Sequence, residues 1–361
     1  MEGKYKVYNN LPPEIIYVDN SSLKRYISLS ELSIREAMKK LNNTIELFQI
    51  IVDENNYFLG TLTDGDIRRG LLNGYNLDEN VSKCMNVSPI LGKIEEQKNN
   101  LIKLKEVDRD PLFLPIVDKK LLLKGILIRN STTDINNALI LAGGMGVRLG
   151  NLTKNKPKPL LEINGIPILE HCIRKLEDAG ISTIYIAINH MSDHIIEFIN
   201  KKEFKSKIIT INESSKLGTI GSLFLVKNKV DFPLLIMNAD LVTTLSIPAL
   251  ISFFKTEKAD GVITAATYEH KVPFGVLRYN SLGQLESIEE KPTDKNLVAA
   301  GVYILNKKIA DLLIKEEFLD MPVLVEKAIK QKHNIVVFPV HEKWKDIGRP
   351  EDYYDAKDLN E

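Results

Sequence analysis

Residues 137–149 read NALILAGGMGVRL, a short apolar run that passes directly into a loop with three glycines. The apolar run has the length and composition of a buried strand. The glycines let backbone N–H groups approach a polyphosphate without a Cβ in the way. The stretch therefore predicts a nucleotide-binding loop made of Leu141, Ala142, Gly143, Gly144 and Gly146.

The spacing of these glycines argues against two common nucleotide-binding motifs. A P-loop requires Lys and then Ser or Thr after its last glycine, whereas Gly146 is followed by Val147 and Arg148. The dinucleotide fingerprint requires a third glycine where this chain has Leu149. A hydride-transfer enzyme is therefore disfavoured.

A basic segment, KPKPLL at residues 156–161, follows the loop. Its prolines hold Lys158 in an extended backbone with little conformational freedom. Together, GGMGVRL and KPKP resemble in composition and spacing the signature of sugar-phosphate nucleotidyltransferases. The resemblance covers about residues 137–361 and implies that Arg148 and Lys158 bind nucleotide phosphates and stabilise the transition state.

Beyond this segment, apolar strand-like runs alternate with helix-like runs. This alternation predicts a mainly parallel sheet covered by helices on both faces. We therefore expect an α/β, Rossmann-like nucleotidyltransferase fold, similar to the GT-A type, over residues 136–361. Ligands of such sheets bind at the carboxyl ends of the strands.

Two aspartates are candidates for metal binding. Asp240 ends the apolar run PLLIMNAD (233–240), where a carboxylate is well placed to hold Mg²⁺. Asp346 begins the DIGRPED stretch, which resembles the family segment that supplies a second metal ligand. We predict that both aspartates bind Mg²⁺ and act as catalytic residues with Arg148 and Lys158.

Further segments predict how the two substrates bind. Glu213 follows a strand-like run, and its carboxylate could accept from both N1–H and the amine of guanine, which favours GTP over UTP or dTTP. The family has a loop comparable to residues 217–219, which adds Gly218 to the nucleotide-binding set. Resemblance to the family also implies four residues that bind the sugar phosphate: Gly275, Glu290, Lys291 and Gly301.

The first third of the chain contains an internal repeat. Residues 51–63 align without a gap with residues 116–128, at an offset of 65 positions (from Asp53 to Asp118). Each copy reads as two apolar strands around a polar turn, as in a hairpin. We expect an α+β module in residues 1–132, with repeats at about 25–85 and 86–130.

The first repeat continues as GTLTDGDIRR (60–69), which resembles the signature of CBS domains. That resemblance implies a regulatory adenine or guanine nucleotide held by Thr63, Asp66 and Arg68. The second repeat has Ile128 and Ser131 in place of the Thr and Asp, so at most one cleft keeps these residues. Alternatively, Thr63 and Asp66 only cap a helix.

Composition narrows the setting of the protein. The 361 residues include 48 basic and 48 acidic side chains, a balance that gives no general reason to bind nucleic acid or an anionic membrane. Two isolated cysteines suit a reducing cytoplasm, and the N-terminus lacks a signal-peptide pattern. The polar segment 129–134 is the expected domain boundary. A homo-oligomer is also expected, because CBS modules often pair between chains.

These observations predict a cytoplasmic enzyme that joins an NTP, with GTP preferred, to a sugar 1-phosphate and releases pyrophosphate. The arrangement of domains resembles guanylyltransferases of bacterial surface-sugar pathways, nearest to those that use glucosamine 1-phosphate for legionaminic acid. Mannose- or heptose-1-phosphate guanylyltransferases, thymidylyl- or uridylyltransferases, and cytidylyltransferases for other alcohol phosphates remain alternatives. A non-catalytic nucleotide sensor is the alternative from another class.

Overall fold

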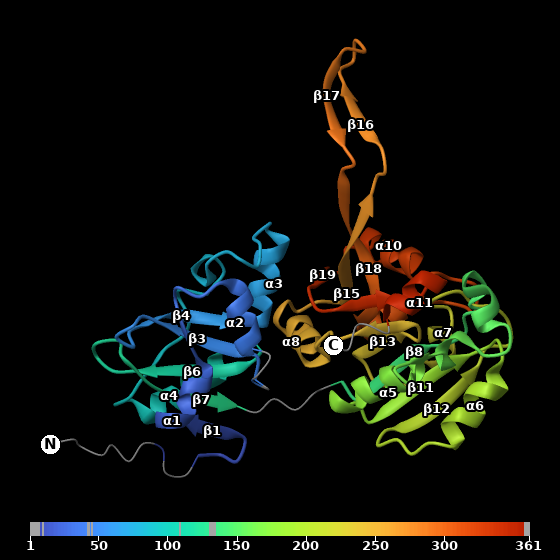
Figure 1. Cartoon of the computed structure of the whole chain (residues 1–361). Helices are drawn as coiled ribbons and strands as arrows, with labels where there is room; N and C mark the ends of the chain where they lie inside the picture. The colour runs from blue at the N-terminus through green and yellow to red at the C-terminus, as the bar shows by residue number, and fades with distance from the viewer. Residues whose placement is uncertain are drawn as a thin grey trace. The chain divides into compact units, whose positions relative to one another are not determined.

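The chain folds into two compact units. A computed structural model describes residues 8, 11–41, 44, 46–107, 110–129 and 135–356. Unit 1 comprises Met1–Asp134 and Ser246–Ala259, and unit 2 comprises Ile135–Leu245 and Asp260–Glu361. Figure 1 shows the order of the elements. Apart from Arg129, the predicted boundary segment lies outside the described residues. Within the described ranges, no helix combines the length and apolar character needed to cross a membrane.

Unit 1 contains the two repeats expected from the sequence, as a three-stranded and a four-stranded sheet. Both predicted hairpins are confirmed: β3 (Phe48–Val52) pairs antiparallel with β4 (Phe58–Thr63), and β6 (Leu112–Val117) with β7 (Leu123–Arg129). Strand β1 (Ile15–Val18), which the repeat did not predict, extends the second sheet by pairing with β7. The remaining elements are α1 (Asn20–Leu23), η1 (Lys24–Tyr26), β2 (Ile27–Leu29), α2 (Ile34–Leu41), α3 (Asp64–Leu72), η2 (Val81–Lys83), β5 (Gly92–Lys93) and α4 (Gln97–Glu106).

The two repeats of unit 1 share one apolar core. Phe48 of the first repeat and Phe113 of the second stack with ring centroids 3.8 Å apart. Ile50 and Ile126, one from each repeat, are completely buried in the same cluster. Because burying an aliphatic or aromatic side chain stabilises by about 1.5–3 kcal/mol, the repeats hold each other together.

Helix α8 (Ile247–Thr256) belongs to unit 1, although its sequence lies between two elements of unit 2. Arg69 on α3 donates to the carboxylate of Glu257 at 2.5 Å, and the Thr256 hydroxyl donates to the carbonyl oxygen of Asp110 at 2.8 Å. The predicted nucleotidyltransferase domain, residues 136–361, included this helix. The structure instead assigns Ser246–Ala259 to unit 1. The contacts join residues 188 and 146 positions apart, which a pattern of local periodicity does not reveal.

Unit 2 is built on a seven-stranded sheet in the order β12-β11-β8-β13-β18-β15-β19. Four neighbouring pairs are parallel, and only β18 runs antiparallel to its neighbours, which confirms the predicted mainly parallel sheet. The strands are β8 (Asn137–Leu141), β11 (Thr183–Ile188), β12 (Lys207–Asn212), β13 (Leu234–Asn238), β15 (Gly261–Lys271), β18 (Thr293–Leu305) and β19 (Ile335–Val340).

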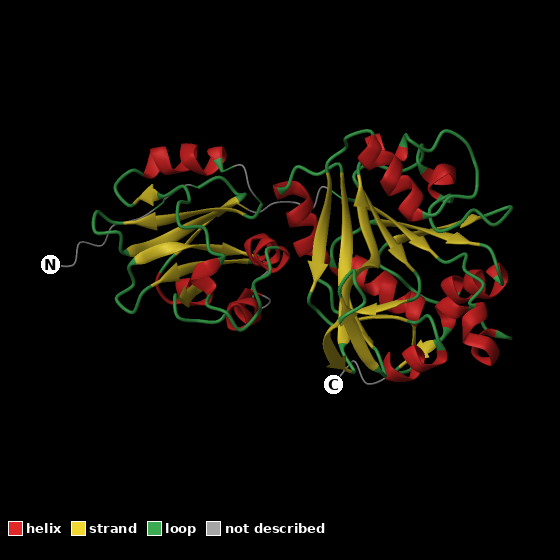
Figure 2. Cartoon of the chain, turned by 90° about the horizontal axis from the view of Figure 1, so that it is seen from above, coloured by secondary structure: helices red, strands yellow, loops and turns green. Residues whose placement is uncertain are grey.

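Helices lie along both faces of this sheet (Figure 2). The central strands are apolar and buried on both sides, as expected for parallel strands between helical layers. On one face, Leu324 and Ala328 of α10 (Met321–Lys330) pack with Leu139 and Ile236 of the sheet. The other helices of unit 2 are α5 (Ile168–Asp178), α6 (Ser192–Asn200), α7 (Leu223–Val226), α9 (Lys307–Ala310) and α11 (Pro350–Ala356).

Strands β15 and β18 continue well beyond the sheet. The last residue of β15 that pairs with β19 is Ala266, and the ribbon runs on to β16 (Gly275–Tyr279) and β17 (Leu285–Glu290). We call residues 267–297 the arm. Figure 1 shows it projecting away from the sheet of unit 2.

Candidate functional site

The two predicted metal-binding aspartates lie side by side. Short strand β14 (Leu241–Thr243) pairs antiparallel with β20 (Trp344–Asp346), which sets Leu241 opposite Asp346. The backbone N–H of Ile347 then donates to the carbonyl oxygen of Asp240 at 3.0 Å. Two segments more than a hundred positions apart thus deliver both carboxylates to one point, at the carboxyl end of β13.

Lys158 joins this pair. Its ammonium group donates to Asp240 Oδ2 at 2.5 Å and lies 3.8 Å from Asp346 Oδ1. Lys158 is only 8% exposed, and it begins a 3₁₀ turn (Lys158–Leu160) between Pro157 and Pro159. The prediction of an extended backbone at Lys158 is wrong, because the extended conformation is confined to the flanking Pro157 and Leu161. The two prolines still restrict the backbone here, and the ammonium group lies beside the aspartates.

One cation does not satisfy both carboxylates. Oδ1 of Asp240 and Oδ1 of Asp346 are buried, and neither accepts a hydrogen bond within the described part of the chain. Loss of solvent, and then the nearby Asp240 charge, raise the pKa of Asp346 above its usual value. Unpartnered carboxylate oxygens of this kind fit a divalent cation, which commonly takes one or two carboxylates and completes its shell with phosphates and water. No cluster of three or more His, Cys, Asp or Glu is present among the described residues.

A cavity of about 340 Å³ opens on the Asp240 side of this cluster. Of the predicted nucleotide-binding residues, Leu141, Gly143, Gly144, Glu213 and Gly218 line it. The sequence analysis missed the other residues that line it: Lys216, Thr219, Asn238, Phe318 and Asp320. Phe318 and Asp320 lie about a hundred positions after Glu213, so no local pattern connects them with the cavity. Lys216 and Thr219 could have been predicted, because they flank the Leu217-Gly218 pair.

The floor of this cavity requires glycine at two of the predicted positions. A Cβ on Gly143 would lie 3.1 Å from both carboxylate oxygens of Glu213. Gly218 has φ +78°, and a Cβ there would lie 2.5 Å from the carbonyl oxygen of Leu319. Burial raises the pKa of Glu213 above its usual value. Glu213 therefore faces the backbone of the glycine loop directly, without an intervening side chain.

Two residues of the predicted loop have structural tasks instead. Ala142 is buried, and its N–H donates to the carbonyl oxygen of Ala187 at 2.8 Å, so this N–H is already occupied by the sheet. Gly146 has φ +65°, and a Cβ there would lie 3.2 Å from Cβ of Lys158. The N–H of Ala142 therefore serves the sheet, although a role of this residue in nucleotide binding stays a prediction. Gly146 allows the loop to pass close to Lys158.

A second cavity, of about 540 Å³, opens on the Asp346 side. It is lined by residues from three parts of the chain: Arg148 after the glycine loop, Thr267, Tyr268, Glu269, Val298 and Ala299 where the arm meets the sheet, and Trp344, Lys345, Asp346, Gly348, Arg349 and Asp352 of the C-terminal segment. The aspartate pair thus belongs to both cavities, because Asp240 lines one and Asp346 the other.

The predicted sugar-phosphate residues separate into two groups. Gly301 lies close to the cluster, since a Cβ there would lie 2.8 Å from Nδ2 of Asn238. Gly275, Glu290 and Lys291 lie on the arm and are not among the described residues that line either cavity. Three of the four residues thus lie on the arm, and the binding of the sugar phosphate by this set stays a prediction.

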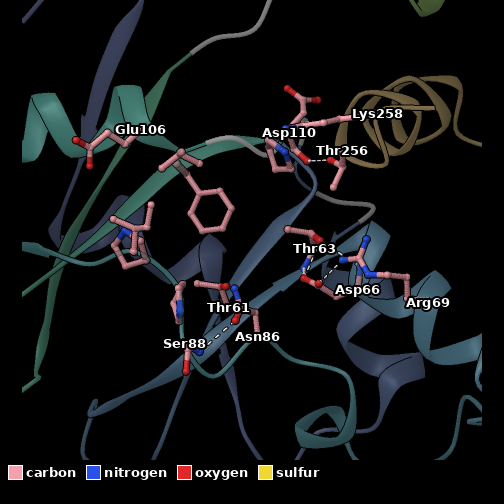
Figure 3. Close-up of a pocket in the computed structure, with 16 residues that line it drawn as sticks. Thr61, Thr63, Asp66, Arg69, Asn86, Ser88, Glu106, Asp110, Thr256 and Lys258 are labelled. Atoms are coloured by element: carbon pink, nitrogen blue, oxygen red, sulfur yellow. Dashed lines mark hydrogen bonds and ion pairs between the residues drawn. The ribbon is translucent and has the colours of Figure 1, made fainter. Parts of the chain in front are cut away.

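Unit 1 contains a separate cavity of about 490 Å³ (Figure 3). Thr63 and Asp66 line it and also form the reciprocal bonds of a capping box at the start of α3, so the capping role is real. Arg69 lines it too, bridging Asp66 and Glu257 at 2.5 Å each. The other residues that line it are the following: Thr61, Asn86, Ser88, Pro89, Ile90, Glu106, Val107, Asp110, Pro111, Phe113, Pro115, Thr256 and Lys258.

Arg68 does not reach this cavity. Its side chain is completely buried and donates two hydrogen bonds, of 2.6 and 3.1 Å, to Asp64 one helical turn earlier. The prediction that Arg68 binds a nucleotide is therefore wrong. It lies on the packed face of α3, whereas its neighbour Arg69 lies on the cavity face.

Comparison with known proteins places the fold. A family model described as Nucleotidyl transferase matches residues 137–361, more than half of the chain. The chain belongs to the nucleotidyl transferase family. A CBS domain model also matches residues 26–73, which include the first repeat's hairpin.

Curated relatives of this nucleotidyl transferase include the mannose-1-phosphate guanyltransferase of Schizosaccharomyces pombe, 32% identical over 60% of this chain and 62% of that protein. The mannose-1-phosphate guanylyltransferase catalytic subunit beta of Drosophila melanogaster is 30% identical over 60% of each chain. This chain thus spans about three fifths of these relatives' length. The crystal structure of HddC from Yersinia pseudotuberculosis matches with a TM-score of 0.51 and 28% identity, over 63% of this chain and all of HddC.

We expect Asp346→Asn to stabilise unit 2 of this nucleotidyl transferase in metal-free buffer at pH 7. The amide replaces a half-exposed carboxylate whose charge raises the energy of the neighbouring Asp240 charge, so a charge repulsion disappears. Trp344 is the only tryptophan in the chain and lies in unit 2, so its fluorescence reports the melting temperature of that unit. The exposed carboxylate control Glu203→Gln should leave the melting temperature unchanged, and a lower one for Asp346→Asn would contradict the repulsion.

Proposed function

We propose that this protein transfers a guanylyl group from GTP to a sugar 1-phosphate and releases pyrophosphate. The observation that carries the proposal is the cluster of Lys158, Asp240 and Asp346 where two cavities adjoin. One cavity is floored by a glycine loop and suits the nucleotide, and the other suits the sugar phosphate. The names of the matched relatives, mannose-1-phosphate guanyltransferases, support this assignment.

The chemistry requires charge compensation rather than a base. An oxygen of the sugar phosphate bonds to the α-phosphorus, and the bond to the bridging β-oxygen breaks, so that pyrophosphate leaves with the electron pair. The attacking oxygen is already anionic at neutral pH. Two unit charges about 4 Å apart repel by about 4 kcal/mol at an effective dielectric of 20. Lys158 and Arg148, which lines the second cavity, supply positive charge to the approaching phosphates.

A divalent cation completes this scheme. Asp240 and Asp346 would hold it through their unpartnered oxygens, and we propose Mg²⁺ because both ligands are hard carboxylates. When bound, it would add positive charge beside the phosphates. Lys158 would then pair with phosphate oxygens in addition to Asp240.

The base preference rests on Glu213. Its half-buried carboxylate lies over Gly143 in the cavity and can accept from N1–H and from the exocyclic amine of guanine. A further structure of HddC, 26% identical with a TM-score of 0.51, is described as complexed with GMP-PN. Both observations favour GTP over UTP and dTTP for this chain.

Two sugar phosphates are the leading candidates. Mannose 1-phosphate is favoured by the names of the relatives, and glucosamine 1-phosphate by the combination of a CBS module with a guanylyltransferase. Heptose 1-phosphate is the next alternative, and glucose 1-phosphate with dTTP or UTP follows.

A substrate screen tests the proposed reaction. We expect pyrophosphate release with GTP and one of mannose, glucosamine or heptose 1-phosphate, and little with CTP, UTP or dTTP. Asp240→Asn should lower kcat/KM by about 100-fold or more, because the variant lacks a carboxylate that would hold the divalent cation beside the phosphates. An inactive wild-type protein across the panel, or an active and folded Asp240→Asn variant, would defeat the proposal.

Glu213→Gln should remove the preference for guanine. The wild-type protein should favour GTP over ITP, which lacks the exocyclic amine, by about 10- to 100-fold, because bound ITP would cover a carboxylate oxygen of Glu213 without donating to it. Glutamine offers one acceptor, so the ratio of the two kcat/KM values should fall towards one. Glu203→Gln, an exposed carboxylate elsewhere, serves as the control. A retained preference for GTP in Glu213→Gln would contradict this assignment of Glu213.

We further infer that the cavity of unit 1 binds a regulatory adenine or guanine nucleotide. It combines hydroxyl and carboxylate groups for a ribose, from Thr63 and Asp66, with the cations Arg69 and Lys258 for phosphate and the apolar ring of Phe113 for a base (Figure 3). Helix α8 gives this ligand a covalent route to the transfer site. Lys258 lies just after the C-terminal end of α8. Three residues separate the start of α8 from the end of β14, the strand that pairs with β20 and so with Asp346.

Titration calorimetry on the full chain tests this regulatory site. We expect binding of at least one of AMP, ATP, GMP or GTP, with a stoichiometry above the one accounted for by the transfer site. Lys258→Gln should weaken that additional binding about 10-fold by removing a charge-assisted contact. Lys119→Gln, an exposed lysine beside another cavity, should not. Absence of any additional binding would eliminate the inference.

A further inference from the structure

One aromatic side chain lines the cavity of about 340 Å³ beside the glycine loop. Of the described residues that line this cavity, Phe318 is the only aromatic one. It is 56% exposed, so a large part of its ring is open to solvent. Single exposed apolar residues are common on protein surfaces, but this one lines a hollow that already contains polar groups able to bind a ligand. Binding of phosphates does not require an aromatic ring, so Phe318 calls for another explanation.

The backbone next to Phe318 is joined to the loop 217–221, which lines the same cavity. The N–H of Leu319 donates to the carbonyl oxygen of Leu217 at 2.8 Å. The N–H of Ile220 donates to the carbonyl oxygen of Leu319 at 3.1 Å. Leu319 thus uses both of its backbone groups in bonds to the loop, as a residue of a strand does.

Two side chains extend this connection. The N–H of Thr219 donates to Oδ1 of Asp320 at 3.0 Å, and the N–H of Met321 donates to the hydroxyl of Thr219 at 2.8 Å. Three consecutive residues after Phe318 are therefore bonded to the loop. A side chain whose backbone is held in this way loses little further freedom when a ligand binds, which favours affinity.

The ring of Phe318 points away from the apolar core of unit 2. Its neighbour Leu319 is 6% exposed and packs in that core with Ile220 and Leu223. Successive side chains of an extended segment point to opposite sides, so a buried Leu319 places Phe318 on the outer side. That outer side is the cavity.

A planar aromatic ligand accounts for this arrangement. A base can stack its flat face on an aromatic ring while its edge stays free for hydrogen bonds. The carboxylate of Glu213 lines the same cavity and can accept from such an edge. Space for a ring is present at the glycine loop, because a Cβ built on Gly144 would have no atom within 4 Å.

We propose that the ring of Phe318 stacks on the base of the bound nucleotide and holds its edge towards Glu213. The proposal rests on the proposed function, since it takes this cavity as the GTP site. The two residues then have different tasks: Phe318 contributes affinity for purine nucleotides in general, and Glu213 selects guanine. Stacking on the base is the same before and during the reaction at the α-phosphorus, so it lowers KM without changing kcat.

Steady-state kinetics of full-length variants at saturating sugar 1-phosphate test the stacking. Phe318→Ala should raise KM for GTP about 10-fold, the size of effect that loss of base–aromatic stacking has, and leave kcat nearly unchanged. KM for ITP should rise by the same factor, because its base has the same ring system. The preference for GTP over ITP should therefore survive in Phe318→Ala, whereas Glu213→Gln removes it.

Two further variants separate stacking from apolar bulk. Phe318→Trp keeps an aromatic ring and should keep KM for GTP near the wild-type value, whereas Phe318→Leu is apolar without a ring and should resemble Phe318→Ala. Ile314→Ala is the matched control: Ile314 lies four residues earlier, is 81% exposed and is not among the described residues that line the cavity. The fluorescence of Trp344 shows whether Phe318→Ala is folded, and if it is not, Phe318→Leu takes its place in the comparison.

Each result decides for or against the stacking. A wild-type KM for GTP in both Phe318→Ala and Phe318→Leu, a loss confined to kcat, or a rise in KM for GTP but not for ITP would overturn it. An equal rise in KM for Ile314→Ala would do the same, because the effect would then not be specific to the ring. All four results leave the transferase proposal standing. A wild-type protein that is inactive with every sugar phosphate would defeat both proposals.

Discussion

The structure depends on holding two like charges together. Asp240 and Asp346 lie side by side, and one buried oxygen of each accepts no hydrogen bond from the described residues, an arrangement that is unfavourable for folding and suited to binding a cation. The pairing of β14 with β20 maintains it, and the ammonium group of Lys158 offsets part of the repulsion. The unfavourable free energy of this repulsion is offset by the packing of the surrounding fold rather than by contacts within the site.

That packing comes from the seven-stranded sheet. Its central strands are buried on both faces, so the carboxyl ends of β8 and β13 are fixed beside each other, and the glycine loop and Asp240 emerge from them. Glycines 143 and 218 then let Glu213 and the loop close on the same small cavity without a Cβ between them. The result is a small cavity beside the glycine loop, whereas the larger cavity opens towards the arm and the C-terminal segment.

The glycine loop, Lys158 and Asp240 could be predicted, because each is marked by a local pattern. Proline on both sides of Lys158, three glycines after a strand, and an aspartate at the end of an apolar run are all visible within a few positions. The prediction for Arg68 was wrong because the residue lies on the buried face of its helix. Arg68 and Arg69 are adjacent in the sequence, but only the second faces the cavity, because the first is on the packed side of α3 beside Asp64. The N–H of Ala142 is already occupied by the sheet.

The sequence alone determined the class of the sheet, the repeat in the first unit, and the residue types able to compensate phosphate charge, because periodicity and motif spacing are local properties of the chain. Only the tertiary structure decided that α8 packs in unit 1 and that Asp240 and Asp346 meet. It also decided that Glu290 and Lys291 lie on the arm and not among the described residues that line the cavity at Asp346. These outcomes depend on contacts between residues far apart in the sequence and on how far a paired ribbon extends before it bends. Neither is encoded in any short stretch of residues.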